Sequence, residues 1–251
     1  MASKTKRQSL ILDRVANGGS LEIAELSAEL RVTGETIRRD IRELQARGLV
    51  RKIHGGVTLP PLVTDGTFHE RMKDNSEGKR RIAEAIASFV QDGDALIIET
   101  GTTATYVAQA LSAKRRLTVV TNSVDVARAL AFHEDNAVYM AGGRLTPADG
   151  AALDHTAAGY MASFRVKYAI FSVAGVDPVD GLMANNVAEA EFTRLVVSRA
   201  EIPVLAVDAS KFGRRGLVRV VEPAAVGIVV TDRVPPKPFA PLFEGVDLRI
   251  A

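Results

Sequence analysis

The chain has 251 residues, of which 47% are hydrophobic and 25% are charged, and its net charge is +2. This is the ordinary balance of a globular protein, so disordered and collagen-like chains are excluded. Cysteine is absent, which excludes disulfides, thiolate metal ligands and a cysteine nucleophile and favours a reducing compartment. No stretch approaches the run of about 18 apolar residues that a membrane span needs. We therefore expect a soluble cytoplasmic protein.

The charge is unevenly distributed along the chain. Residues 1–60 contain 11 lysines and arginines against 7 acidic residues, a net charge of +4, whereas the remainder carries −2. A small basic unit joined to a mildly acidic body indicates that the two parts meet different partners, and nucleic acid is the natural partner of the basic part.

The N-terminal unit is predicted to hold three short helices. Apolar spacing predicts helices at Ser9–Val15 and Leu21–Leu30. The helix-breaking sequence Asn-Gly-Gly at residues 17–19 separates them. A turn then leads to a third helix that is capped by Thr33. This helix buries one stripe, at helical spacing, formed by Ile37, Ile41 and Leu44.

The opposite side of the third helix carries its polar residues, Glu35, Thr36, Arg38, Arg39 and Arg42. Two helices joined by a tight turn form a helix-turn-helix, whose second helix lies in the DNA major groove. A guanidinium can pair bidentately with guanine or with a phosphate, which explains why arginines suit this face.

The segment "LVRKIHGG" that follows predicts a β-hairpin wing ending in Gly55 and Gly56. Its basic residues Arg51, Lys52 and His54 are expected to contact the DNA backbone. The alternative is that the arginines only form an ordinary solvent-exposed face of the helix, where Asp40 and Glu43 offset their charge. Three helices, a turn and a basic wing coincide here, which favours DNA binding.

The segment "TIRRDIRELQARGLVRKIHGG" resembles the winged helix-turn-helix of the DeoR family of bacterial transcriptional repressors. The resemblance implies that the partner is double-stranded operator DNA. Thr33 stands where the family more often has serine, which preserves the cap. The DNA-binding domain is thus predicted at residues 1–57. A linker with Pro60 and Pro61 is predicted at 58–74, and an effector-binding and oligomerisation domain at 75–251.

The larger domain alternates apolar strands with amphipathic helices, which predicts an α/β fold with a mainly parallel sheet covered on both faces. The expected strands are Ala95–Ile98, Leu117–Thr121, Ala137–Ala141, Tyr168–Ala174, Val204–Val207 and Gly227–Val230. The expected helices lie near residues 79–90, 103–112, 123–132, 156–163 and 187–199.

Polar or glycine-rich segments follow several of these strands, at the sheet edge where such folds bind ligands. These segments are Gly101-Thr102-Thr103, Thr121-Asn122-Ser123, Gly142-Gly143, and Asp208 with Ser210 and Lys211. Taken singly, each is an ordinary helix cap, turn or surface charge. Their repetition predicts a pocket for a small phosphorylated molecule, with Lys211 as its charge partner. No dinucleotide or ATP motif is present.

The order of these segments resembles the C-terminal effector domain of DeoR-type regulators, which is related to ribose-5-phosphate isomerase and binds phosphorylated sugars or polyols. Segments such as "FHERM" are most similar to the subgroup that responds to glycerol 3-phosphate. Glu99 stands where the family usually has aspartate, and Asp154 where glycine is common. The predicted effector contacts are Glu99, Gly101, Thr102, Thr103, Thr121, Asn122, Gly142, Gly143, Asn186, Glu189 and Lys211.

The rival interpretation is a sugar-phosphate isomerase that uses Glu99, Asp177 or Glu189 as a general base. Attachment to a DNA-binding unit argues against it, because a repressor gains nothing by consuming its signal. A second rival is a nucleic-acid-binding protein whose larger domain only oligomerises, without an effector. We therefore expect a homo-oligomeric regulator, a dimer or tetramer, with no catalytic residues, metal or cofactor.

Overall fold

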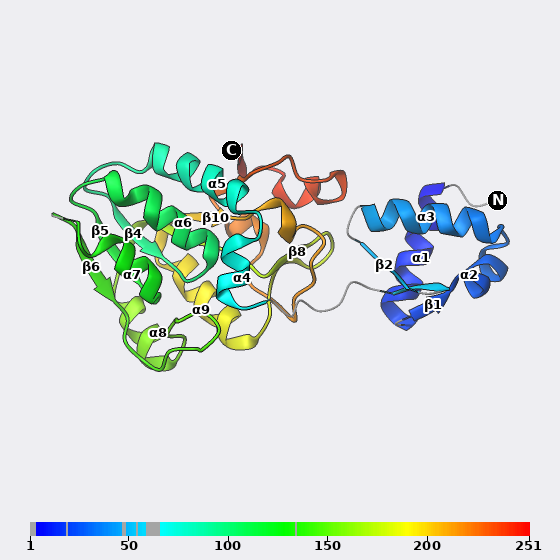
Figure 1. Cartoon of the computed structure of the whole chain (residues 1–251), viewed down its shortest axis with the longest axis horizontal. Coiled ribbons are helices and arrows are strands. Elements are labelled where there is room, and N and C mark those ends of the chain that lie inside the picture. Colours follow the sequence, from blue (N-terminus) through cyan, green and yellow to red (C-terminus); the bar gives the residue numbers. More distant parts are fainter. Residues whose placement is uncertain (1–3, 19, 47–48, 54, 59–65, 134) are drawn as a thin grey trace. The chain divides into compact units, whose positions relative to one another are not determined.

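The computed structural model describes residues 4–18, 20–46, 49–53, 55–58, 66–133 and 135–251. Their contacts divide the chain into an N-terminal unit, formed mainly by Met1–Leu62, and a larger unit formed by Val63–Phe212 and Gly216–Ala251. Figure 1 shows both units with their helices and strands. Among the described residues, no helix is long and apolar enough to cross a membrane.

The N-terminal unit is a three-helix domain with a small antiparallel sheet. Its elements are α1 (Lys4–Gly18), β1 (Ser20–Glu22), α2 (Ile23–Leu30), α3 (Gly34–Ala46), β2 (Arg51–Ile53) and β3 (Gly56–Thr58). The predicted stripe of α3 is confirmed, because Ile37, Ile41 and Leu44 are at most 1% exposed. They form one core with Ile11 and Val15 of α1 and with Leu26 of α2.

The predicted start of the second helix at Leu21 is wrong. Residues Ser20–Glu22 form β1, which pairs with β3 of the wing, and α2 begins only at Ile23. The side chains of Glu22 and Glu25 form a capping box that starts the helix there. The pairing requires Gly56, since a Cβ at this position would lie 2.4 Å from the Leu21 carbonyl oxygen.

The larger unit contains a seven-stranded sheet in the order β13-β12-β10-β7-β4-β5-β6, with all pairs parallel. The predicted parallel sheet is therefore confirmed, although the edge strand β13 was not predicted. The strands are β4 (Ala95–Ile98), β5 (Thr118–Thr121), β6 (Ala137–Met140), β7 (Val166–Phe171), β10 (Ala200–Ala206), β12 (Ile228–Thr231) and β13 (Asp247–Ile250).

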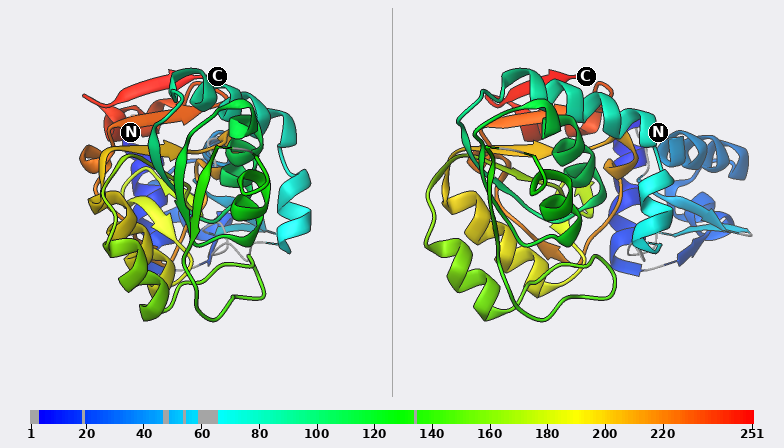
Figure 2. Two further views of the ribbon diagram at one scale, coloured as in Figure 1. Left: turned by 90° about the vertical axis from the view of Figure 1, so that its left-hand side faces the viewer. Right: turned by 60° about the vertical axis from the view of Figure 1, so that its left-hand side comes forward.

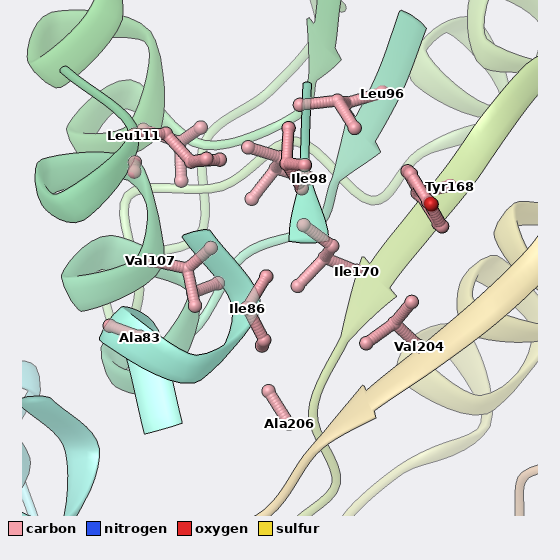
Figure 3. Close-up of a cluster of buried hydrophobic side chains, with 14 of the residues drawn as sticks. Ala83, Ile86, Leu96, Ile98, Val107, Leu111, Tyr168, Ile170, Val204 and Ala206 are labelled. Carbon is pink, nitrogen blue, oxygen red and sulfur yellow. The ribbon is translucent and has the colours of Figure 1, made fainter. Parts of the chain in front are cut away.

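Helices cover both faces of this sheet (Figure 2). One face packs against α5 (Ser76–Phe89), α6 (Thr102–Ala110) and α7 (Val124–Leu130). The other packs against α8 (His155–Ala162) and α9 (Val187–Ser198). Alternate residues of each strand serve the two faces. Figure 3 shows this on the first face, where side chains from β4, β7 and β10 meet those of α5 and α6.

Two further features of the larger unit were not predicted. A small antiparallel sheet consists of β8 (Gly175–Asp177), β9 (Gly181–Ala184) and β11 (Val218–Arg219). The second is α4 (Phe68–Lys73), which occupies part of the segment that we expected to be a linker. None of its residues is buried, so it lacks the apolar periodicity from which a helix is predicted. Its start is instead fixed by a capping box between Thr67 and Glu70.

Candidate functional site

The outer face of α3 presents three arginines to solvent. The side chains of Arg38, Arg39 and Arg42 are 51%, 76% and 63% exposed. The helix begins at a cap in which Thr33 Oγ1 accepts the amide hydrogen of Thr36 at 3.3 Å. The buried stripe fixes the rotation of the helix about its axis, so the arginines are directed away from the core.

Glu35 organises two of these arginines. Its carboxylate oxygens lie 2.6 Å from Arg42 Nη2 and 3.5 Å from Arg38 Nη1. Within the described part of the chain, the ion pair of Arg39 is a longer contact of 3.8 Å with Glu43. Such exposed ion pairs contribute about 0–1 kcal/mol to stability. A DNA phosphate can therefore replace the carboxylate partner of each arginine with little loss of stability.

The wing adds basic side chains from β2. Arg51 and Lys52 are both exposed, and the amide of Lys52 donates to Gln45 Oε1 of α3 at 3.3 Å. This contact ties the hairpin to the end of α3. His54, the remaining predicted wing residue, lies outside the described residues. The N-terminal unit thus combines an arginine-bearing helix with a basic hairpin, which is the arrangement of a winged helix-turn-helix.

The larger unit has a cavity of about 220 Å³ at the carboxyl ends of β4 and β7. These strands are neighbours in the sheet, but the chain runs from β4 towards β6 on one side and from β7 towards β13 on the other. The point at which strand order reverses leaves a crevice between the outgoing loops, and ligands of open α/β folds bind there.

Six of the predicted effector residues line this cavity: Glu99, Gly101, Thr102, Thr103, Glu189 and Lys211. The first four come from the end of β4 and the start of α6, whereas Glu189 belongs to α9. The lining further includes Gly66, Arg71, Thr100, Ala148, Asp149, Ser172, Val173, Ala174, Ala184, Asn185, Thr193 and Val220.

Gly101 shapes the loop that opens α6. Its φ is +137°, and a Cβ there would lie 2.8 Å from Ser172 Oγ. Only glycine fits both constraints. The first residues of α6, Thr102 and Thr103, line the cavity. The first amides of a helix have no partner within the helix and are available to a ligand. The hydroxyl of Thr100, which also lines the cavity, is buried and has no hydrogen-bond partner among the residues that the structure describes.

Glu99 is a buried carboxyl group at the cavity wall, 4% exposed. The hydroxyl of Thr193 lies 2.9 and 3.1 Å from its two oxygens. Burial raises the pKa of Glu99 to about 8, and the nearby charge of Glu189 acts in the same direction, while the Thr193 hydrogen bond opposes them. Glu99 is therefore mostly protonated at neutral pH and can donate a hydrogen bond.

Five predicted effector residues lie outside the cavity lining: Thr121, Asn122, Gly142, Gly143 and Asn186. Asn122 is fully buried and supports the cavity from behind, accepting from the Thr100 amide at 3.1 Å and donating to the Ala152 carbonyl at 3.1 Å. Asn186 caps α9 and donates to Glu189 Oε1 at 2.8 Å. Both residues therefore position others that do line the cavity.

Gly142 and Gly143 follow the edge strand β6, two strands away from β4. Gly143 packs against Asp154, which accepts from the amides of Arg144, Thr156 and Ala157. These backbone hydrogen bonds lower the pKa of Asp154. Asp154, which replaces a common family glycine, thus caps α8 and holds the preceding turn.

Several lining residues escaped the sequence analysis. Ser172 directly follows β7, which ends at Phe171. The expected strand Tyr168–Ala174 continues past this point, so the sequence places Ser172 within a strand and the rule that found Gly101 misses it. Thr193 lies one helical turn after Glu189, on the same side of the predicted helix. The helical spacing could therefore have predicted that Thr193 lies near the cavity. Arg71 and Asp149 are joined by an ion pair across 78 positions of sequence, and no local pattern predicts such a pair.

The fold and the two sites define a class of protein, a DNA-binding regulator with a separate ligand-sensing domain. Comparison with known families agrees. Residues 7–61 match the DeoR-like helix-turn-helix domain, and residues 74–233 match the DeoR C-terminal sensor domain. The chain belongs to the DeoR family of transcriptional regulators.

The relatives include the glycerol-3-phosphate regulon repressor of Escherichia coli K12, 33% identical over 93% of this chain and 92% of the relative. The HTH-type transcriptional repressor CsqR of the same strain is 33% identical over 92% of this chain and 88% of the relative. Both are regulators, so the prediction of a regulator rather than an enzyme is confirmed.

A solved D-ribose-5-phosphate isomerase in complex with phospho-erythronic acid is 20% identical over 54% of this chain and 53% of the isomerase, with a TM-score of 0.39. A likeness of that size indicates nothing about activity.

Proposed function

We propose that this protein is a repressor of a sugar or polyol catabolic operon and that a phosphorylated metabolite releases it from its operator. One observation carries the proposal. In a chain with a winged helix-turn-helix, the cavity at the β4–β7 reversal brings the glycine-threonine loop of α6 together with the cationic residues Arg71 and Lys211.

The cavity offers two kinds of chemistry. Backbone amides at the start of α6 and the side chains of Lys211 and Arg71 suit a phosphate group. The acidic and amide side chains of Glu99, Glu189 and Asn185 suit the hydroxyl groups of a sugar or polyol. A phosphorylated polyol such as glycerol 3-phosphate combines both groups, and the similarity to a glycerol-3-phosphate regulon repressor supports this class.

On the DNA side, Arg38, Arg39 and Arg42 are the proposed contacts from α3, with guanine edges or phosphates at the major groove. Arg51 and Lys52 are the proposed backbone contacts from the wing. Helix-turn-helix proteins read successive major grooves as symmetric pairs, so we place the protein in a cytoplasmic dimer or tetramer. Residues 75–251 would then provide both effector binding and oligomerisation. The ligand must bind the DNA-free form more tightly, because a ligand with equal affinity for both forms would shift nothing.

The test is binding of the purified chain to its own upstream DNA at fixed salt, titrated with glycerol 3-phosphate, fructose 1-phosphate and tetrose and pentose phosphates. Release by one of these compounds supports the proposal and identifies the signal. Tight binding that is indifferent to all of them contradicts the effector half. In the variant Lys211→Ala, operator binding should persist while release needs more ligand.

A further inference from the structure

An ion pair joins two segments of the cavity wall. Arg71 of α4 donates from Nη2 to Oδ1 of Asp149. Asp149 lies in the irregular segment between β6 and α8. The two side chains are only 16% and 15% exposed, and both residues line the cavity. The guanidinium of Arg71 therefore faces the ligand space while an internal carboxylate holds it.

The backbone of α4 is held by polar contacts. Lys79 of α5 is 2% exposed, and its ammonium donates to the carbonyl oxygens of Arg71 and Asp74, the latter at 2.7 Å. The hydroxyl of Tyr106 donates to the Met72 carbonyl at 3.1 Å. No residue of α4 is buried, so apolar packing contributes little to its position. A change in the partner of Arg71 therefore acts on a helix whose position depends mainly on polar contacts.

The segment that carries Asp149 is held by backbone hydrogen bonds within its own turn and by one to the start of α7, where the Val124 amide donates to the Gly150 carbonyl at 3.2 Å. The Thr146 amide donates to the Ala151 carbonyl at 2.8 Å, and the Gly150 amide donates to the Thr146 carbonyl at 2.9 Å. Beyond this turn, the Ala152 amide anchors the chain to the Asn122 carbonyl at 3.0 Å. Asp149 lies within the turn rather than at the anchor, so its carboxylate can move without breaking the sheet.

A phosphate competes directly with a carboxylate for a guanidinium. Both form bidentate hydrogen bonds with arginine, but phosphate brings more charge and a third acceptor oxygen. A phosphate in this cavity is attracted by Arg71 and repelled by Asp149. The pair cannot persist unchanged when the phosphate arrives, because two anions would share one guanidinium.

We propose that Arg71 is a second cationic ligand for the effector's phosphate and that Asp149 is its internal competitor, displaced when the effector binds. This inference rests on the proposed function. The exchange of partners takes place on α4, the first helix after the residues that connect to the DNA-binding unit. It therefore acts on the helix that lies nearest in the sequence to the DNA-binding unit.

The experiment measures the affinity of the full-length chain for inorganic phosphate by calorimetry, at one pH and ionic strength. Asp149→Asn removes the competitor's charge and keeps its shape, so phosphate should bind roughly fivefold to tenfold more tightly than to the wild type. Arg71→Ala should weaken binding by roughly tenfold or more, and Asp149→Asn should then give no gain in the double variant.

The matched control is Asp247→Asn, which removes the same charge from the Arg249–Asp247 ion pair on β13. It should leave phosphate affinity unchanged. Equal or weaker phosphate binding by Asp149→Asn would overturn the proposal. If the ion pair only held the cavity wall in place, its loss would loosen the wall and weaken phosphate binding. Unchanged affinity in Arg71→Ala, or no phosphate binding by any variant, would overturn it as well.

The operator assay separates this inference from the proposed function. If Asp149→Asn binds phosphate more tightly but no phosphorylated compound releases any variant from DNA, the partner exchange stands and the effector role fails. If a compound releases the wild type and Asp149→Asn needs as much of it or more, the effector role stands and the exchange fails.

Discussion

The hydroxyl of Thr193 lies within hydrogen-bond distance of both carboxyl oxygens of Glu99, at 2.9 and 3.1 Å. Thr193 is itself only 4% exposed, so the pair sits between α9 and the end of β4, away from bulk water. No cation contacts Glu99 among the described residues. The protonated form of Glu99 is therefore favoured in the folded protein. We expect the stability of the protein to depend on pH as a result.

Glu99→Gln should remove a pH dependence from the stability of the larger unit. The folded chain holds the Glu99 proton up to about pH 8, whereas the ordinary pKa is 4.5. The stability that this proton contributes is complete below pH 4.5 and is lost as the pH rises towards 8, at about 1.4 kcal/mol per pH unit at most. Glutamine mimics the protonated form and has no proton to lose.

The measurement is the thermal midpoint of wild type and Glu99→Gln between pH 5 and 8. The wild type should lose stability more steeply, and the variant should be the more stable protein at pH 8. Glu244→Gln, an exposed carboxyl group outside the cavity, serves as the control. Parallel curves for wild type and Glu99→Gln would mean that Glu99 is ionised in the folded protein.

Gly101→Ala should damage the effector site without affecting DNA recognition. The added methyl group meets Ser172 Oγ at 2.8 Å and the backbone has φ of +137°, so we expect a cost of about 1–3 kcal/mol. Operator binding should persist while ligand-induced release is lost. Gly142→Ala is the matched control, because a Cβ there meets no atom within 4 Å. A wild-type ligand response in Gly101→Ala would remove this loop from the site.

Asp40→Ala should destabilise the N-terminal unit by about 3 kcal/mol. Asp40 is 1% exposed, and its oxygens accept from Arg7 Nε at 2.5 Å and Nη2 at 3.1 Å, which binds α1 to α3. The hydrogen bond with Asp40 raises the pKa of Arg7. Hydrogen exchange of the α1 and α3 amides measures the loss. Glu43→Ala, a more exposed carboxylate on the same helix, should cost much less.

Arg39→Ala should weaken operator binding by roughly tenfold and reduce the salt dependence by about one phosphate contact, with little change in stability. Its side chain is 76% exposed, and its nearest described carboxylate is 3.8 Å away, so DNA binding is the property that its loss should affect. Fluorescence anisotropy at several salt concentrations measures both effects. Arg80→Ala on α5, also exposed, is the control. Equal affinity and salt slope in the two variants would place Arg39 outside the interface.

The sequence by itself determined the elements whose signals are local. The stripe of Ile37, Ile41 and Leu44 placed α3 and the direction of its arginines, since helical period alone decides which side faces the core. The apolar run at Ala95–Ile98 gave β4 with its observed ends. Glycine and threonine after that strand marked the loop that lines the cavity, because the carboxyl end of a parallel strand is where a ligand meets free amides.

Only the tertiary structure decided which strand ends lie together. Gly142 and Asn122 carry the same local signals as Gly101, but the sheet order places β5 and β6 on the far side of β4 from β7. The pairing of β1 with the wing and the Arg71–Asp149 ion pair are likewise contacts between distant segments. Such contacts depend on how the crossovers arrange the strands in space, which no periodicity within one segment encodes.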